Sequence, residues 1–226
     1  LNSSPASAGY IFGVSQLSGV FDLWIHMIKA ARVWRSAVIP QNPVPKALCR
    51  TDAAAEKAGI FIGGWYAATI SDFQAGNVLW FAFRVDSSFF PASKRANNHL
   101  ISAAEALGVA VAVSLWGSDL LQSDSMVTVF GAKRWYSPSE NLAKAMTFLV
   151  RGCMAWGLRP KISHVAGKSN MLADSLSRLE VDPEAPRALS WLHESGRASP
   201  EVLYEVLPEL AEYLTPLSLE GCGAPA

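Results

Sequence analysis

A histidine and an aspartate, ten residues apart across a turn of small residues, constrain the fold of this chain more than any other feature. The segment reads HVAGKSNMLADSLSR from His164 to Arg178. Residues 161–165 predict a short strand, residues 166–169 a turn, and residues from Asn170 onward a helix that turns Asp174 toward the sheet. Alone, a histidine and an aspartate indicate only a surface turn before an amphipathic helix. The ten-residue spacing across a turn of small residues suits a nuclease site, with His164 at its rim.

Composition describes an ordinary globular chain. Its 226 residues are 50% hydrophobic and 17% charged, enough for one sizeable core with flanking elements. The net charge is zero, so any surface that binds nucleic acid must be a local one. Its expected sources are Lys133, Arg134, Lys144, Arg151, Arg159, Lys161, Lys168 and Arg178.

Cysteine spacing and hydropathy indicate an intracellular location, cytoplasmic or nuclear. Cys49, Cys153 and Cys222 are far apart and odd in number, which argues against a disulfide framework and against a zinc site. The apolar stretch 103–116 is too short to span a bilayer and contains a glutamate, so we expect no membrane partner. The chain begins with Leu1 rather than a methionine, which suggests that it is a piece of a longer protein.

The hydrophobic pattern predicts three strands, a helix, a strand, helices, a strand and a helix. The first strands are expected at 47–53, 59–67 and 77–85, a helix at 100–116, a short strand at 120–123 and a short helix at 125–132. Ser137, Pro138 and Glu140 form a capping sequence for the next helix, which Gly157 and Pro160 close.

The two ends lie outside this pattern. Residues 19–35 predict an appended helix, followed by a Pro-containing linker, so residues 1–45 form the first segment. The main domain is expected over 46–180. Residues 181–226 form a C-terminal extension with a helical stretch at 200–213 and a frayed tail.

Three acidic residues lie in or directly after separate predicted elements. Asp52 lies at the centre of the first strand, where a carboxylate among apolar neighbours is costly unless it is paired or metal-bound. Glu105 is the only charge between His99 and Asp119, although a solvated helix face would also explain it. Asp124 follows the short strand. Hydrolysis of a phosphodiester with two metal ions requires such carboxylates to converge from separate elements.

These residues resemble a known family. The pattern His-hydrophobic-x-Gly-x-x-Asn-x-x-Ala-Asp-x-Leu-Ser-Arg recurs in the ribonuclease H domain behind the reverse transcriptase of retroelement polyproteins, and nine positions match at 164–178. Other motifs of that family are similar to three further features of this chain: Thr51-Asp52-Ala53, Ser123-Asp124-Ser125 and the spacing from Glu105 to Trp116. The resemblance covers roughly residues 45–180.

The resemblance implies an α/β fold, a ribonuclease H-like mixed five-stranded sheet flanked by helices, here with extra helices at both ends. It implies an endonuclease that cleaves the RNA strand of an RNA/DNA hybrid, with an upstream reverse transcriptase domain as partner. Asp52, Glu105, Asp124 and Asp174 would hold two Mg²⁺ ions, with Mn²⁺ as a possible substitute, and His164 would assist proton transfer or product release.

Two departures keep an alternative open. Ala54 replaces the family's usual serine, and only seven residues separate Trp116 from Asp124, which shortens the fourth strand and would allow Asp124 to be displaced. A catalytically inactive connection or nucleic-acid-binding module is therefore the second hypothesis. A resolvase or transposase of the same fold is a third. We predict that Asp124, rather than Asp119, lies within roughly 4 to 7 Å of Asp52.

Residues outside the carboxylate set are expected to bind nucleic acid. Lys133, Arg134 and Trp135 combine basic and aromatic side chains in a polar turn, which suits a phosphate backbone. Lys168 and Asn170 belong to the histidine loop and are assigned the same role.

Overall fold

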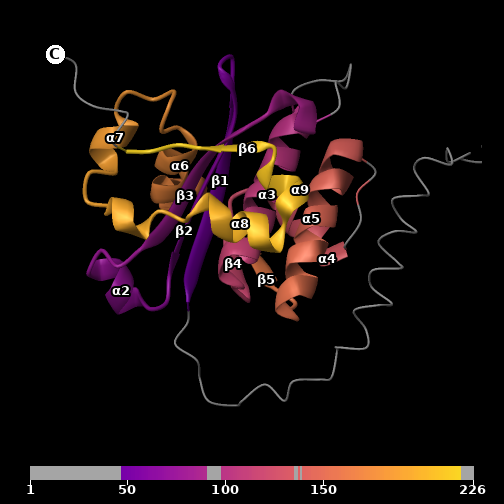
Figure 1. Ribbon diagram of the computed structural model, residues 1–226, viewed down its shortest axis with the longest axis horizontal. Helices are drawn as coiled ribbons and strands as arrows, with labels where there is room; N and C mark the ends of the chain where they lie inside the picture. The colour runs from indigo at the N-terminus through magenta and orange to yellow at the C-terminus, as the bar shows by residue number, and fades with distance from the viewer. Residues whose placement is uncertain (1–46, 91–97, 135–136, 138, 220–226) are drawn as a thin grey trace, which may run out of the picture. The chain divides into compact units, whose positions relative to one another are not determined.

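A mixed six-stranded sheet forms the centre of the computed structural model, which describes residues 47–90, 98–134, 137 and 139–219 (Figure 1). The strand order is β5-β4-β1-β2-β3-β6. The strands are β1 (Leu48–Glu56), β2 (Gly59–Ala67), β3 (Leu79–Val85), β4 (Leu120–Ser123), β5 (Lys161–His164) and β6 (Leu214–Pro216). The expected α/β, ribonuclease H-like fold is confirmed by this order, because β1 to β3 form an antiparallel meander and β4 and β5 run parallel to β1.

Helices cover both faces of the sheet, as alternation along the strands requires. Phe81 and Phe83 of β3 pack with α3 (Asn98–Trp116) and α5 (Glu140–Trp156), whereas Trp80 and Ala82 pack with α6 (Met171–Ser177). Figure 1 shows α3, α4 (Met126–Arg134) and α5 on one side and α6 and α7 (Ala185–Ala188) on the other. The remaining short elements are α2 (Ile70–Gln74), η1 (Ser87–Phe89), η2 (Gly167–Ser169) and η3 (Glu194–Gly196).

The start of α5 differs from its predicted capping sequence. The N-cap is Ser139, two residues beyond Ser137, and its side chain makes no capping hydrogen bond. Ser137 Oγ instead accepts a hydrogen bond from the Ser139 N–H, so the serine forms a local turn. The predicted end is confirmed: Gly157 has φ 62° in the left-handed region, which glycine adopts without steric cost.

The C-terminal segment corrects two expectations. The single helix expected at 200–213 is divided into α8 (Pro200–Val206) and α9 (Pro208–Ala211), because Pro208 lacks the N–H that a continuous helix needs. The tail expected to fray provides β6, which pairs with β3 and makes the sheet six-stranded rather than five-stranded. Leu203, Leu207 and Leu210 pack into the same core as α3.

The expected N-terminal elements, the appended helix at 19–35 and the linker after it, fall outside the residues that the structure describes. The domain boundaries at 45 and 180 remain predictions. Within the part of the chain that is described, no helix combines the length and the apolar character that crossing a membrane requires.

Candidate active site

Three carboxylates from three elements converge at the centre of the sheet. One oxygen each from Asp52 of β1, Glu105 of α3 and Asp124 after β4 lie within 4.8 Å of one another. Asp52 and Glu105 are buried, with 4% and 5% of their surface exposed, and Asp124 is half-buried. The predicted proximity of Asp124 to Asp52 is confirmed. Asp119 is exposed in the turn before β4 and is not part of this group.

The short fourth strand is sufficient to position Asp124. Ser123, the last residue of β4, lies opposite both Thr51 of β1 and His164 of β5. The next residue therefore emerges beside the centre of β1, where Asp52 is located. The hypothesis that a truncated strand displaces Asp124 is wrong, because parallel pairing on both sides fixes the end of β4.

Glu105 is anchored toward the sheet rather than solvated. The Ala53 N–H donates to Glu105 Oε1 at 3.2 Å, and Ser123 Oγ donates to Oε2 at 3.3 Å. Groups on β1 and β4 thus donate hydrogen bonds to the Glu105 carboxylate. This excludes the alternative that Glu105 lies on a solvated face of its helix.

Ser177 is a site residue that sequence reasoning missed. Its Oγ lies 2.7 Å from Asp52 Oδ2, to which it donates, and it is buried at the end of α6. The helix reaches β2 because Gly63 has no side chain: a Cβ there would lie 2.4 Å from the Ser177 nitrogen. The available signal was spacing, since Ser177 lies three residues after Asp174 on the same helix face.

Burial and mutual repulsion raise the pKa values of two of the carboxyl groups. Burial is the main cause for Asp52, whose pKa rises to about 7 with a smaller contribution from the charge of Asp124, while Ser177 opposes the rise. Burial also raises the pKa of Glu105 to about 9, with the charges of Asp52 and Asp124 adding to it. The cluster therefore favours protons or a cation among its oxygens.

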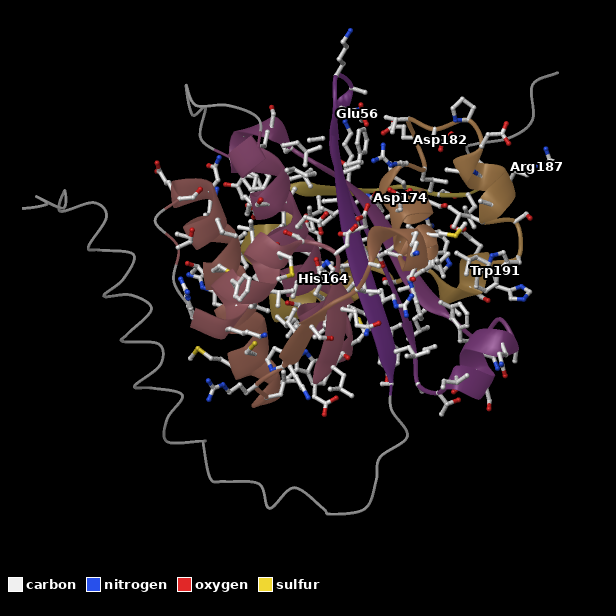
Figure 2. The ribbon with its side chains drawn as sticks, turned by 180° about the vertical axis from the view of Figure 1, so that it is seen from behind. Glu56, His164, Asp174, Asp182, Arg187 and Trp191 are labelled. Carbon is white, nitrogen blue, oxygen red and sulfur yellow. The ribbon has the colours of Figure 1, made fainter. Side chains whose placement is uncertain are left out.

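Asp174 lies beside the three carboxylates rather than among them. Its Oδ1 accepts a hydrogen bond from Arg178 Nε at 2.8 Å, and Arg178 Nη1 lies 3.1 Å from Glu56 Oε1. The Asp174 side chain is 49% exposed, so the expectation that it points inward needs correction. It is still near enough for its charge to raise the pKa of Asp52. Figure 2 labels Asp174 on α6, Glu56 at the end of β1 and His164 at the end of β5.

His164 occupies the expected rim position. It is exposed and ends β5, and the next residue, Val165, donates its N–H to the Ser123 carbonyl at 3.0 Å. The loop that follows borders the carboxylates, because a Cβ at Gly167 would lie 3.2 Å from Asp124 Oδ2. The histidine and the carboxylates thus share one edge of the site.

The residues expected to bind nucleic acid differ in how exposed they are. Lys133 and Arg134 are exposed at the end of α4, Lys168 is exposed in η2, and Trp135 lies outside the described residues. Asn170 is a correction, because it is 1% exposed and its Nδ2 donates to the Thr51 carbonyl at 3.0 Å. It ties the loop to β1 and offers no surface to a ligand.

Arg50 is a second residue that was missed. It lies two positions before Asp52, on the same face of β1, a spacing that the period of a strand made available. Its Nε donates to Gln122 Oε1 at 2.8 Å, its Nη1 donates to the Ser169 carbonyl, and its guanidinium lies over the Trp65 ring. Arg50 therefore connects β1, β4 and the loop before α6.

No family model matches the sequence, and no curated protein does. Among solved structures, ribonuclease H1 from the halophilic archaeon Halobacterium salinarum NRC-1 is similar, with 16% identity and a TM-score of 0.41. The match covers 63% of this chain and 98% of that chain.

Proposed function

We propose that this protein is an endonuclease that hydrolyses the RNA strand of RNA/DNA hybrids. The observation that supports the proposal most is the convergence of Asp52, Glu105 and Asp124 within 4.8 Å, on a fold with ribonuclease H-like strand order. Clustering buried acids on three separate elements costs stability, which is typical of a catalytic or metal-binding site.

The donor set suits Mg²⁺. Hard oxygen ligands are what this ion prefers. Burial, together with the neighbouring carboxylate charges, raises the pKa values of Asp52 and Glu105, so a cation among their oxygens would be stabilising. Asp52, Glu105, Asp124 and Asp174 would hold two ions, with Mn²⁺ as a possible substitute. When bound, such ions lower the pKa of a water molecule and stabilise the charge on the phosphate and leaving oxygen.

The protein's own groups would orient the substrate and move protons. Ser177 holds Asp52 Oδ2, and the Ala53 N–H with Ser123 holds Glu105, so both carboxylates are fixed before substrate binds. His164, exposed beside the Asp124 loop, would accept or deliver a proton or assist product release.

His164→Ala should slow cleavage by about 10- to 100-fold, measured by single-turnover cleavage. It should leave the cation affinity, measured by calorimetry, nearly unchanged.

The biological setting is part of the proposal. The sequence pattern at 164–178 supports a ribonuclease H-type domain of a retroelement reverse transcriptase, with the polymerase domain as its partner. The free, buried thiols of Cys49 and Cys153 are compatible with a reducing compartment, cytoplasmic or nuclear.

A substrate panel tests the proposal. A labelled RNA/DNA hybrid, double-stranded RNA, single-stranded RNA and double-stranded DNA would be incubated with Mg²⁺ or with EDTA. We expect Mg²⁺-dependent cleavage of the hybrid's RNA strand alone. Cleavage of DNA would favour the resolvase or transposase alternative, and cleavage that persists in EDTA would contradict the metal-dependent reading.

The second candidate is a catalytically inactive, nucleic-acid-binding module. The observation that favours it is the ion pair of Asp174 with Arg178, which keeps the fourth carboxylate outside the group of three. Hybrid binding without any cleavage in Mg²⁺ or Mn²⁺ would support this candidate over the first.

A further inference from the structure

A cleft lined by positive charge lies between the end of α4 and the start of β5. It encloses about 280 Å³, and its walls are Ala132, Lys133, Arg159, Pro160, Lys161 and Ile162. The lysines and the arginine are exposed. Among the described residues, none of the ion pairs includes any of these three cations. Within the described part of the chain, the cleft therefore carries three cations that are not engaged in these ion pairs.

The fold brings these cations together from separate segments. Lys133 is in the last turn of α4, Arg159 is in the connection after α5, and Lys161 begins β5. The Lys161 N–H bonds to the Asp119 carbonyl at 2.7 Å, which fixes the start of β5 beside β4. Like charges that converge in this way repel one another unless an anion lies between them. In a chain with zero net charge, such a local excess indicates an anionic ligand.

The cleft and the carboxylates lie at opposite ends of the same two elements. Helix α4 begins two residues after Asp124 and runs for nine residues to the cleft, an axial length of about 13 Å. Lys161 lies three residues before His164 on β5, a separation of roughly 10 Å. With about 3.4 Å per nucleotide along one strand, these distances correspond to roughly three to four nucleotides.

We propose that this cleft binds the phosphodiester backbone of the nucleic acid about three to four nucleotides from the cleavage site. The inference rests on the proposed function and extends it, since Arg159 and Lys161 join Lys133 as contacts. The recognition is independent of base sequence, because cations that contact phosphate position a strand without reading its bases. The lining favours a backbone over a compact cofactor, since the walls provide only positive charge, two apolar side chains and a proline.

Hybrid binding at several salt concentrations tests the cleft without requiring catalysis. Fluorescence anisotropy in EDTA would compare the wild type with Arg159→Gln/Lys161→Gln. The matched control is Lys57→Gln/Arg187→Gln, which removes the same charge from exposed positions in the β1–β2 turn and on α7. Circular dichroism would verify that all variants fold.

We expect the cleft variant to bind at least about tenfold more weakly near 0.1 M salt, with the slope of log K against log salt reduced by about 1 to 2. The control should stay within about twofold of the wild type. Equal effects of the two double substitutions would overturn the proposal, because general charge would then explain them. Titration with inorganic phosphate distinguishes a site for free phosphate from a site for a nucleic-acid backbone. Saturable phosphate binding at the cleft, with hybrid affinity unchanged in the cleft variant, would also overturn the proposal.

The two proposals fail in distinguishable ways. A wild-type protein that binds hybrid through the cleft and yet does not cleave it in Mg²⁺ would overturn the catalytic assignment alone. If the wild type cleaves the hybrid, but its affinity and salt slope do not change when Arg159 and Lys161 are substituted, only the proposed role of the cleft would be overturned.

Discussion

The Ser177 hydroxyl controls how easily Asp52 ionises. It donates to Asp52 Oδ2 at 2.7 Å inside the protein, and hydrogen bonds to a charged group contribute about 1.5–3 kcal/mol. Ser177→Ala should raise the pKa of Asp52 further and weaken Mg²⁺ binding near pH 7 several-fold, measured by calorimetry. Ser175→Ala, on the same helix, is the control. An unchanged Mg²⁺ affinity in the Ser177 variant would show that the hydroxyl does not tune the site.

At the scale of elements, the contact of α6 with β2 depends on one missing side chain. A Cβ at Gly63 would lie 2.4 Å from the Ser177 nitrogen and 2.6 Å from Leu176, and backbone atoms cannot move aside cheaply. Gly63→Ala should cost roughly 1–3 kcal/mol of unfolding free energy and shift Ser177 away from Asp52. Chemical denaturation measures the first effect and cation titration the second.

The same substitution in α4 is the matched control. A Cβ at Gly131 would lie 3.9 Å from Leu142 and from Met146, an ordinary contact distance, and alanine favours a helix over glycine. Gly131→Ala should leave the protein as stable or stabilise it by up to about 1 kcal/mol. If both variants lost stability equally, the close approach of α6 would not be the cause.

Strong local patterns made these elements predictable. The strand, turn and helix at 161–178 were expected from His164, small residues and Asn170, and they are β5, η2 and α6. The strand at 120–123 matches β4 at both ends. Asp52 and Glu105 were predictable because each acid interrupts an apolar pattern, and such interruptions need a compensating interaction. Asp124 stands among polar residues, and its place in the group was expected from the family resemblance and from its position after the short strand.

Tertiary contacts explain what the sequence did not reveal. β6 is only three residues long and includes a proline, so its pairing with β3 depends on the edge that the meander leaves open. Asn170 looked like a surface residue, yet it is buried because α6 packs closely on β1 and β2. The Arg178 bridge between Asp174 and Glu56 joins residues more than a hundred positions apart, which no local pattern indicates.

For the molecule as a whole, the buried acids make stability depend on pH. The pKa of Asp52 rises from 3.8 to about 7 and that of Glu105 from 4.5 to about 9, so the folded state binds more protons than the unfolded state. Stability without a cation is therefore full below about pH 4 to 5 for these two groups, and it falls as pH rises toward 9.

Thermal unfolding with and without Mg²⁺ measures this dependence. In EDTA, Tm should fall between pH 5 and 9, by roughly 2–4 °C for each kcal/mol lost. Millimolar Mg²⁺ should restore Tm at pH 8 to 9 and have little effect at pH 5, where protons occupy the carboxyl groups. A Tm in EDTA that rises through this range would contradict the burial of ionisable acids.

Single-turnover cleavage of an RNA/DNA hybrid by Asp124→Asn and Asp119→Asn tests the central claim most directly. The two aspartates lie five residues apart, but only Asp124 shares the group with Asp52 and Glu105. With Mg²⁺ present, Asp124→Asn should slow cleavage at least about a hundredfold, equivalent to about 2.7 kcal/mol of barrier. Asp119→Asn should cleave at the wild-type rate. Cleavage by Asp124→Asn at the wild-type rate would contradict the assignment of these three carboxylates as the catalytic centre.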